Sequence, residues 1–379
     1  MNPTHQLVPH DKTYYSARFL HTFPDPKEIL KTTTPILIYG AGRMGKIFLK
    51  NLKAHDITVV ACIDNNPAII GTRIGNIPVI SRIDAQQHYK NAHILIASLM
   101  YESEIYTMLK KHGFTTIYPL YLLHMWKPKI FVSAEYTRYF PVLFSRQNQY
   151  ELENVMNYLQ DNASRKVLKN NILFRLSGNK SFIHASKTRR AMFDEPTIFS
   201  FSQQEIFADC GGYTGDSIQA FVTQVNHTYE TIYSFEPDKK NFTELETFVK
   251  KAQFQRVIPV PQGIYNKTTT LKFSSAGTVD SRISSEGDTS IPVTTLDAYF
   301  ADKKPPTFIK MDIEGVEKNA LLGAKKLLRT MKPKLAISIY HHATDIWKLP
   351  LLIRTLNPSY RLYMRHYTDE IVDTLCYAV

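Results

Sequence analysis

The stretch Phe207–Ser217, FADCGGYTGDS, sets the architecture of the larger part of this chain. It runs from an apolar segment through a glycine-rich turn into the start of a predicted helix. Gly211 and Gly215 permit a tight turn and a close approach of the backbone to a ligand, as in the strand–turn–helix units of doubly wound sheets. Apolar runs alternate with helical segments from here to residue 379, which predicts an α/β domain.

The electrostatics of this turn indicate which ligand it suits. Asp209 and Asp216 would repel a pyrophosphate but attract a cofactor that carries an ammonium and a sulfonium, such as S-adenosylmethionine. Glu236 follows Asp209 by twenty-seven residues, at the end of the next predicted strand, where a carboxylate can accept hydrogen bonds from both ribose hydroxyls. Alternatively, the two aspartates only stabilise a helix N-terminus. The predicted cofactor-binding residues are Asp209, Gly211, Gly212, Tyr213, Gly215, Asp216, Glu236, Pro237 and Gly263.

Several ordered segments resemble the FkbM family of S-adenosylmethionine-dependent methyltransferases. The most specific is Lys310–Glu317, KMDIEGVE. The resemblance covers about residues 200–379 and implies a class I methyltransferase fold, a mostly parallel seven-stranded sheet with a reversed last strand. It also implies O-methylation of a small-molecule or glycolipid acceptor, such as a sugar or polysaccharide precursor. The resembling segments are 207–217, 234–238, 291–300, 308–324 and 337–350.

Asp312, Glu314 and His341 are the predicted catalytic residues, because they follow two predicted strands at the edge where ligands bind in such sheets. An alcohol is a poor nucleophile until a positioned base removes its proton. His341 is favoured by its ordinary pKa, since it would be largely neutral at pH 7, and Asp312 by its motif position. Which of the three is the base stays open. A divalent metal on these residues, or purely structural roles at a helix start and a strand end, are the alternatives.

A second glycine turn lies near the N-terminus, in Ile38–Gly45, IYGAGRMG. Arg43 and Lys46 place positive charge at a predicted helix start, which favours a phosphate. Asp64 follows Gly45 by nineteen residues, about where an acid meets a ribose. We expect a nucleotide or nucleotide-sugar there. The glycines could instead serve packing alone. The predicted nucleotide-binding residues are Gly40, Gly42, Arg43, Gly45 and Asp64.

The chain is therefore expected to contain two Rossmann-like, doubly wound α/β domains joined by a helical connector. The predicted parts are an N-terminal extension (1–33), an accessory nucleotide-binding domain (34–125), a connector or cap (126–204) and a methyltransferase domain (205–379). Two other functions remain open at this stage. One is an NAD(P)-dependent oxidoreductase or epimerase that uses the N-terminal turn, and the other is a non-catalytic nucleotide-binding protein.

Composition narrows the class and the partners. A hydrophobic fraction of 44% with 21% charged residues is typical of a globular protein, and the three cysteines lie too far apart for a metal knuckle. A reducing cytoplasm is the expected location. The net charge of +12 indicates either attraction to anions, including peripheral association with a membrane, or a basic solvated surface. The basic segments lack aromatic interleaving, so a nucleic-acid partner is not expected. The oligomeric state is not indicated.

Overall fold

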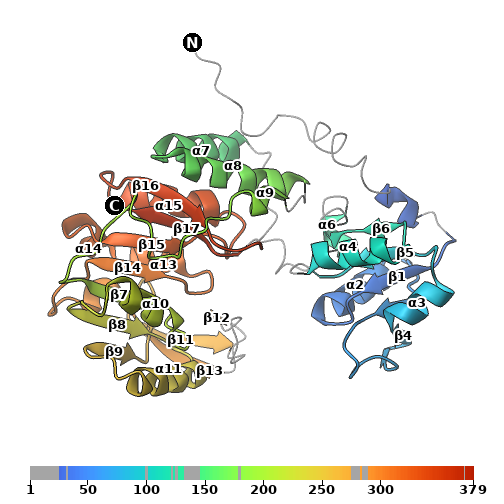
Figure 1. The fold of residues 1–379 in the computed structure, drawn as a ribbon, viewed down its shortest axis with the longest axis horizontal. Coiled ribbons are helices and arrows are strands. Elements are labelled where there is room, and N and C mark those ends of the chain that lie inside the picture. The colour runs from blue at the N-terminus through green and yellow to red at the C-terminus, as the bar shows by residue number, and fades with distance from the viewer. Residues whose placement is uncertain are drawn as a thin grey trace, which may run out of the picture. The chain divides into compact units, whose positions relative to one another are not determined.

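The structure is a computed structural model. The chain forms two compact units, Met1–Phe144 with Ile172–Phe182, and Ser145–Asn171 with Ile183–Val379 (Figure 1). Most of the predicted N-terminal extension lies outside the described residues. The structure describes residues 25–30, 33–98, 101–120, 123, 127–131, 146–177, 181–274, 282–283, 289–370 and 372–379.

The first unit contains a six-stranded sheet in the order β3-β4-β2-β1-β5-β6. Strand β1 is completely buried and pairs in parallel with β2 and β5, which confirms the predicted α/β architecture. The hairpin β3–β4 was not predicted, because its strands are short and turn at Gly75, which has a φ of 58°. The strands are β1 (Ile36–Tyr39), β2 (Ala61–Ile63), β3 (Arg73–Ile74), β4 (Ile77–Ile80), β5 (His93–Ile96) and β6 (Ile117–Tyr118).

Short helices connect these strands. The start of α3 is fixed by a capping box, in which Ser81 and Asp84 each accept a backbone N–H of the other. Helix α4 is followed by Gly113, whose φ of 84° ends it. The described helices that lie wholly in this unit are η1 (Pro26–Leu30), α2 (Arg43–Lys53), α3 (Arg82–His88), α4 (Glu102–Lys111) and α6 (Pro128–Phe131).

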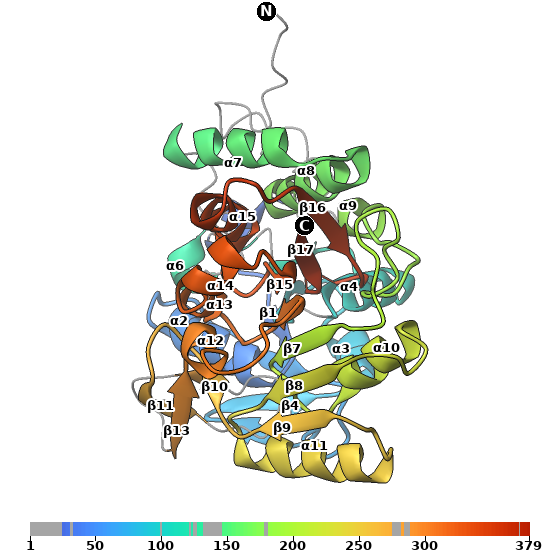
Figure 2. The ribbon, with the colours of Figure 1, turned by 90° about the vertical axis from the view of Figure 1, so that its left-hand side faces the viewer.

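The second unit contains a seven-stranded sheet in the order β16-β17-β15-β14-β7-β8-β9. Strand β7 is central and buried, with β8 and β14 parallel to it on either side. Strand β17 is antiparallel to both β15 and β16, which confirms the expected reversed last strand. Figure 2 shows β7, β8 and β9 side by side. The strands are β7 (Ile206–Cys210), β8 (Thr231–Phe235), β9 (Val257–Val260), β14 (Phe308–Met311), β15 (Lys334–Ser338), β16 (Leu362–His366) and β17 (Thr374–Ala378).

A four-stranded sheet and a set of helices complete this unit. The small sheet has the order β10-β13-β11-β12, and its strands β10, β12 and β13 were not predicted. Its strands are β10 (Gly263–Ile264), β11 (Thr269–Ser274), β12 (Arg282–Ile283) and β13 (Thr289–Thr294). The helices after β7 are α10 (Asp216–Gln224), α11 (Lys239–Lys251), α12 (Leu296–Tyr299), α13 (Glu317–Leu322), α14 (Lys325–Thr330) and α15 (Asp345–Leu356).

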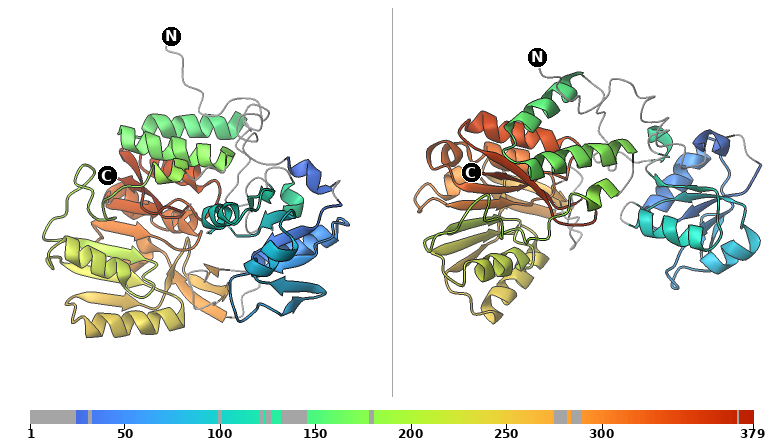
Figure 3. Two further views of the ribbon diagram at one scale, coloured as in Figure 1. Left: turned by 45° about the vertical axis from the view of Figure 1, so that its right-hand side comes forward. Right: turned by 45° about the horizontal axis from the view of Figure 1, so that its top comes forward.

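Much of the predicted connector packs on the second unit. Helices α7 (Arg146–Tyr158), α8 (Asn162–Ser177) and α9 (Ser181–His184) precede β7, and α7 packs against α15, as both views of Figure 3 show in green and red. Lys348 of α15 lies 2.6 Å from Glu151 of α7. Further along, Phe193 and Phe199 join the aromatic core around Phe207. Residues 145–171 and 183–204 are therefore part of the C-terminal unit.

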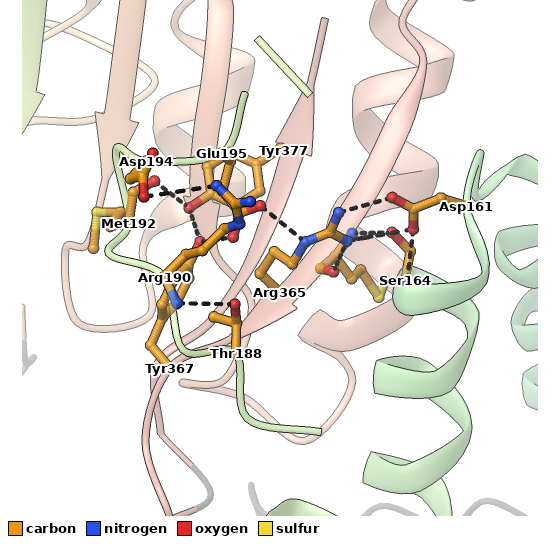
Figure 4. A network of polar contacts seen from close by, with 11 residues as sticks. Asp161, Ser164, Thr188, Arg190, Met192, Asp194, Glu195, Arg365, Tyr367 and Tyr377 are labelled. Carbon is orange, nitrogen blue, oxygen red and sulfur yellow. Dashed lines mark hydrogen bonds and ion pairs between the residues drawn. The ribbon is translucent and has the colours of Figure 1, made fainter. Parts of the chain in front are cut away.

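Arg365 on β16 makes the main polar contacts between these preceding segments and the large sheet (Figure 4). Its guanidinium lies 2.8 Å from Asp161 at the start of α8 and 3.2 Å from Glu195. Its side chain is only 9% exposed, and Glu195 is also buried. Because a buried carboxylate needs a partner, this cation ties two segments that are distant in sequence to one strand.

Replacing Arg365 by methionine should lower the free energy of unfolding by about 3 kcal/mol, because Glu195 would be left buried without a cation. Arg190 is the matched control, since its pair with Asp194 is about half exposed. Arg190→Met should change that free energy by less than about 0.5 kcal/mol. Urea unfolding followed by circular dichroism measures both, and equal losses would contradict a special role for the buried arginine.

Candidate functional site

The glycine turn after β7 and the acid after β8 form one hydrogen-bonded unit. Tyr213, with a φ of 46°, donates its backbone N–H to Glu236 Oε2 at 2.9 Å. The other oxygen, Oε1, accepts the N–H of Asp238 at 2.8 Å. Burial raises the pKa of Glu236 to about 7, although these two N–H groups act in the opposite direction. Each carboxylate oxygen keeps a second acceptor position beside the turn.

The glycines of this turn are required by their surroundings. Gly211 has a φ of 88°, and a Cβ there would lie 1.9 Å from the carbonyl oxygen of Asp312. A Cβ at Gly212 would lie 2.1 Å from Ser234 Oγ. Gly263, on β10, lies against Pro237, since its Cβ would be 3.5 Å from that ring. Six of the predicted cofactor-binding residues thus lie in one neighbourhood, formed by the turn, the end of β8 and β10: Gly211, Gly212, Tyr213, Glu236, Pro237 and Gly263.

Asp209 does not have the role predicted for it. Its side chain is fully buried and lies 3.2 Å from Lys310 Nζ on the neighbouring strand β14. Ser217 and Ser234 donate hydrogen bonds to its second oxygen, both at 3.0 Å. A direct contact between Asp209 and the ammonium of a cofactor is therefore excluded, because the carboxylate is already enclosed by these groups. Asp216, the exposed first residue of α10, is the acid of the turn that faces solvent.

Lys310 holds the glycine turn after β7 in place from the buried side. Besides Asp209, it donates to the carbonyl oxygen of Gly211 at 3.0 Å and to Ser217 Oγ at 3.3 Å. Although burial disfavours its charge, the carboxylates of Asp209, Asp312 and Asp216 raise the pKa of Lys310 above its ordinary value. The lysine therefore stays charged and holds the ends of β7 and β14 together.

The predicted catalytic residues converge beside this turn. Asp312 follows β14, and its backbone N–H bonds to the carbonyl of Cys210 at 3.0 Å. His341 Nε2 lies 3.4 Å from Asp312 Oδ1 and 3.6 Å from Glu314 Oε2. Asp312 and Glu314 are partly exposed, at 27% and 37% of their side chains. The acids are thus accessible and adjacent to the glycine turn.

The expectation that His341 is neutral at pH 7 is wrong. Its side chain is 5% exposed, and its Nδ1 lies 2.9 Å from Glu317 Oε1. Although burial acts against its charge, Glu317, Asp312 and Glu314 raise the pKa of His341 to about 10. Such an imidazole is already protonated and is shielded from an acceptor. The accessible proton acceptors are the carboxylates of Asp312 and Glu314.

Sequence reasoning missed three residues of this cluster. Glu317 ends the KMDIEGVE motif, and its Oε1 accepts the N–H of Ile313 at 2.9 Å. Tyr340 donates its hydroxyl to Asp312 Oδ1 at 3.0 Å. Asp373 precedes β17, where burial and the charge of Asp312 raise its pKa to about 6. The motif itself could have indicated Glu317, but no local pattern marks Asp373, which only the reversed strand brings here.

The N-terminal turn repeats part of this design. Asp64, after β2, accepts the N–H of Ala41 at 2.8 Å and that of Asn66 at 2.9 Å. Glu236 makes the same two bonds, one to its glycine turn and one to the residue two positions later. Gly45 is needed for packing, since its Cβ would lie 1.9 Å from the carbonyl of Gly40.

The N-terminal turn leaves space for a ligand at Gly42 and in a neighbouring cavity. A Cβ at Gly42 would meet nothing within 4 Å. Arg43 begins α2 and is exposed. A cavity of about 300 Å³ lies beside the turn, with two cationic side chains on its wall. It is lined by Ala41, Lys46, Ile69, Thr72, Arg73, Ile74 and Val79.

The strand order and the acid-lined glycine turn define a class I methyltransferase fold in the C-terminal unit. Residues 209–376 match the family model described as the Methyltransferase FkbM domain, which identifies a methyltransferase domain in this part of the chain. Residues 32–116 match a model described as C2185-like, N-terminal. That second match does not name a ligand, so nucleotide binding there stays a prediction. A comparison with curated proteins finds no match.

Solved structures extend the likeness to both units. The chain is similar to Methyltransferase FkbM from Methylobacillus flagellatus, at 22% identity and a TM-score of 0.73, over 97% of this chain and 100% of that one. This shows a shared fold. An rRNA methylase from Streptococcus thermophilus (13% identity, TM-score 0.30, 47% and 86% covered) is far less similar. Aeropyrum pernix fibrillarin, solved with S-adenosyl-L-methionine, is also far less similar (10% identity, TM-score 0.31, 48% of this chain and 70% of that one covered). These two support no conclusion.

The close approach of Gly211 to Asp312 can be tested with alanine. Gly211→Ala should destabilise the protein by at least about 2 kcal/mol more than Gly71→Ala. Gly71 has a similar φ, 83°, but nothing within 4 Å of its Cβ, so it carries only the backbone cost of about 1 kcal/mol. Urea unfolding gives both free energies. Equal losses of unfolding free energy in the two variants would show that the backbone at Gly211 is not in close contact with Asp312.

Proposed function

We propose that this protein is a cytoplasmic S-adenosylmethionine-dependent methyltransferase that methylates a hydroxyl oxygen of a sugar or of a glycolipid or polysaccharide precursor. The observation that carries the cofactor is Glu236, a buried carboxylate at the end of β8 that is bonded to the glycine turn. The methyltransferase domain match supports the same cofactor. The three cysteines are free and buried, as suits a reducing compartment. In the described part of the chain, no helix is long and apolar enough to cross a membrane.

The geometry supports a direct displacement. The acceptor oxygen attacks the methyl carbon, the carbon–sulfur bond breaks with its electron pair going to sulfur, and S-adenosylhomocysteine leaves. The hydroxyl proton passes to Asp312 or Glu314, the accessible carboxylates beside the turn. Although burial works against it, the cations His341 and Lys310 hold the pKa of Asp312 below its ordinary value, so this acid is ionised at neutral pH. An acidic site also attracts the cationic sulfonium cofactor.

Glu236→Ala should weaken the binding of S-adenosylhomocysteine by about 10- to 100-fold, because two hydrogen bonds to a charged acceptor are lost. In the parent protein, affinity should rise about tenfold from pH 6 to pH 8, since only the ionised carboxylate accepts from both ribose hydroxyls and its pKa is about 7. Titration calorimetry measures both effects.

The matched control is Glu244→Ala, an exposed glutamate of the adjacent helix α11. It should bind like the parent protein at every pH. If the parent does not bind S-adenosylhomocysteine, or if Glu236→Ala binds as tightly with the same pH dependence, the cofactor assignment is overturned.

For the N-terminal unit we propose a nucleotide-bearing ligand, which in this enzyme would be an activated sugar. Asp64 is held like Glu236, and Lys46 and Arg73 line the cavity beside the turn. Gly42 leaves room for a phosphate to approach the start of α2. These features favour a nucleotide diphosphate over an uncharged ligand.

Titration calorimetry of the full chain with UDP-glucose and with ADP tests this second proposal. Gly42→Asp should abolish binding by adding a negative charge at the turn, whereas Gly42→Ala should retain it. Both variants fit the structure, since φ at Gly42 is −75° and the space is open. Both should bind S-adenosylhomocysteine normally. If neither nucleotide binds the parent, the unit has no such role.

A further inference from the structure

Three side chains from neighbouring elements meet at the edge of the large sheet. Asp312 follows β14, His341 follows β15, and Glu317 is the first residue of α13. Each offers an oxygen or nitrogen atom, and these atoms all lie within 4.8 Å of one another. The closest pair, His341 Nδ1 and Glu317 Oε1, is 2.9 Å apart.

Two of the three side chains are buried and carry polar atoms that make no hydrogen bond. His341 is 4% exposed and Glu317 is 0% exposed. Within the described part of the chain, Glu317 Oε2 and the two ring nitrogens of His341 make no hydrogen bond, and the ring nitrogens contact their neighbouring carboxylates only as ion pairs. Buried polar atoms almost always have a partner, so the unbonded Oε2 of the fully buried Glu317, in a cluster of possible metal ligands, indicates a missing one.

The cluster is also arranged to stay in place without that ligand. Glu317 Oε1 accepts the backbone N–H of Ile313 at 2.9 Å. Tyr340 donates to Asp312 Oδ1 at 3.0 Å. Such bonds orient the carboxylates and are typical of the groups that surround the ligands of a metal site.

The chemistry and the spacing suit a divalent cation. Three carboxylates, those of Asp312, Glu314 and Glu317, surround a single imidazole. Ions of the first transition row take carboxylate oxygen with imidazole nitrogen, at bond lengths of about 2.0–2.2 Å. Ligand atoms bound at that length lie roughly 3–4 Å apart, and one oxygen or nitrogen atom each from Asp312, Glu317 and His341 lies within 4.8 Å of the other two.

We propose that Asp312, Glu317 and His341 bind a divalent cation of the first transition row, such as Mn²⁺ or Zn²⁺, and that the imidazole of His341 releases one proton to solvent as the ion binds. Its role rests on the proposed function: the ion binds the acceptor hydroxyl and makes its proton easier to remove. Asp312 is then a metal ligand, and Glu314, at the exposed rim of the cluster, is the group positioned to take the proton.

Binding of Mn²⁺ to the chelator-treated full chain tests the site without any need for turnover. Free Mn²⁺ is followed by electron paramagnetic resonance, and one ion should bind per chain. Asp312→Asn and Glu317→Gln should each weaken binding more than about tenfold. Glu244→Gln, on the exposed face of α11, should bind like the parent. No binding of Mn²⁺ or Zn²⁺ by the parent, or unchanged binding by both ligand variants, overturns the proposal.

Two further measurements separate this site from the rest of the account. Circular dichroism shows whether each variant is folded, and Asp312→Asn, whose side chain is partly exposed, carries the test if Glu317→Gln does not fold. S-adenosylhomocysteine should bind equally to metal-free and Mn²⁺-loaded protein. Intact binding of that cofactor product without metal binding overturns only the metal site. Metal binding without cofactor binding overturns the methyltransferase proposal and leaves the site itself standing.

Discussion

A buried ion pair between Asp209 and Lys310 underlies the whole site. It joins the end of β7 to the neighbouring strand β14, and the same ammonium holds the carbonyl oxygen of Gly211 at 3.0 Å. With these groups fixed, the turn follows one path, on which Tyr213 donates its N–H to Glu236. Removing either partner would leave an uncompensated charge in the interior, which is costly, so the pair enforces this geometry. Of the acidic residues that the sequence analysis assigned to the cofactor, Asp209 therefore stabilises the turn from the interior, whereas Glu236 stays available for the proposed cofactor.

The two units hold their glycine turns with the same pattern of hydrogen bonds. In each, an acid after the second strand of a strand–turn–helix unit accepts one N–H from the glycine turn and one from two residues further along the chain. What differs is the charge around the turn. Cations flank the N-terminal one, at Lys46 and Arg73, whereas carboxylates dominate the C-terminal one. One backbone design thus favours a phosphate in the first case and a sulfonium in the second.

The sequence predicted most of the architecture because strand periodicity and glycine turns are local signals. It missed β3, β4, β10, β12 and β13, which are mostly short strands without alternation. It also placed residues 145–171 and 183–204 in a connector, although they belong to the C-terminal unit, where Phe193 and Phe199 complete the core around Phe207.

In the site, spacing located the turn, Glu236 and the acidic motif. It could not show that Asp209 is enclosed by Lys310, because that lysine lies about a hundred residues further along the chain. Nor could it show that Glu317 charges His341, or that Asp373 joins the cluster, since both depend on tertiary contacts. Burial and pairing, which set the pKa of each group, are properties of the folded chain.

The central claim is that the acidic turn of the C-terminal unit holds S-adenosylmethionine. Ultraviolet cross-linking of methyl-labelled S-adenosylmethionine to the full chain, followed by peptide mapping, tests it most directly. The account predicts label in peptides that contain Tyr213 or Glu236, and loss of that label in excess S-adenosylhomocysteine. Label confined to peptides from residues 36–64, or label that excess S-adenosylhomocysteine does not displace, would contradict it.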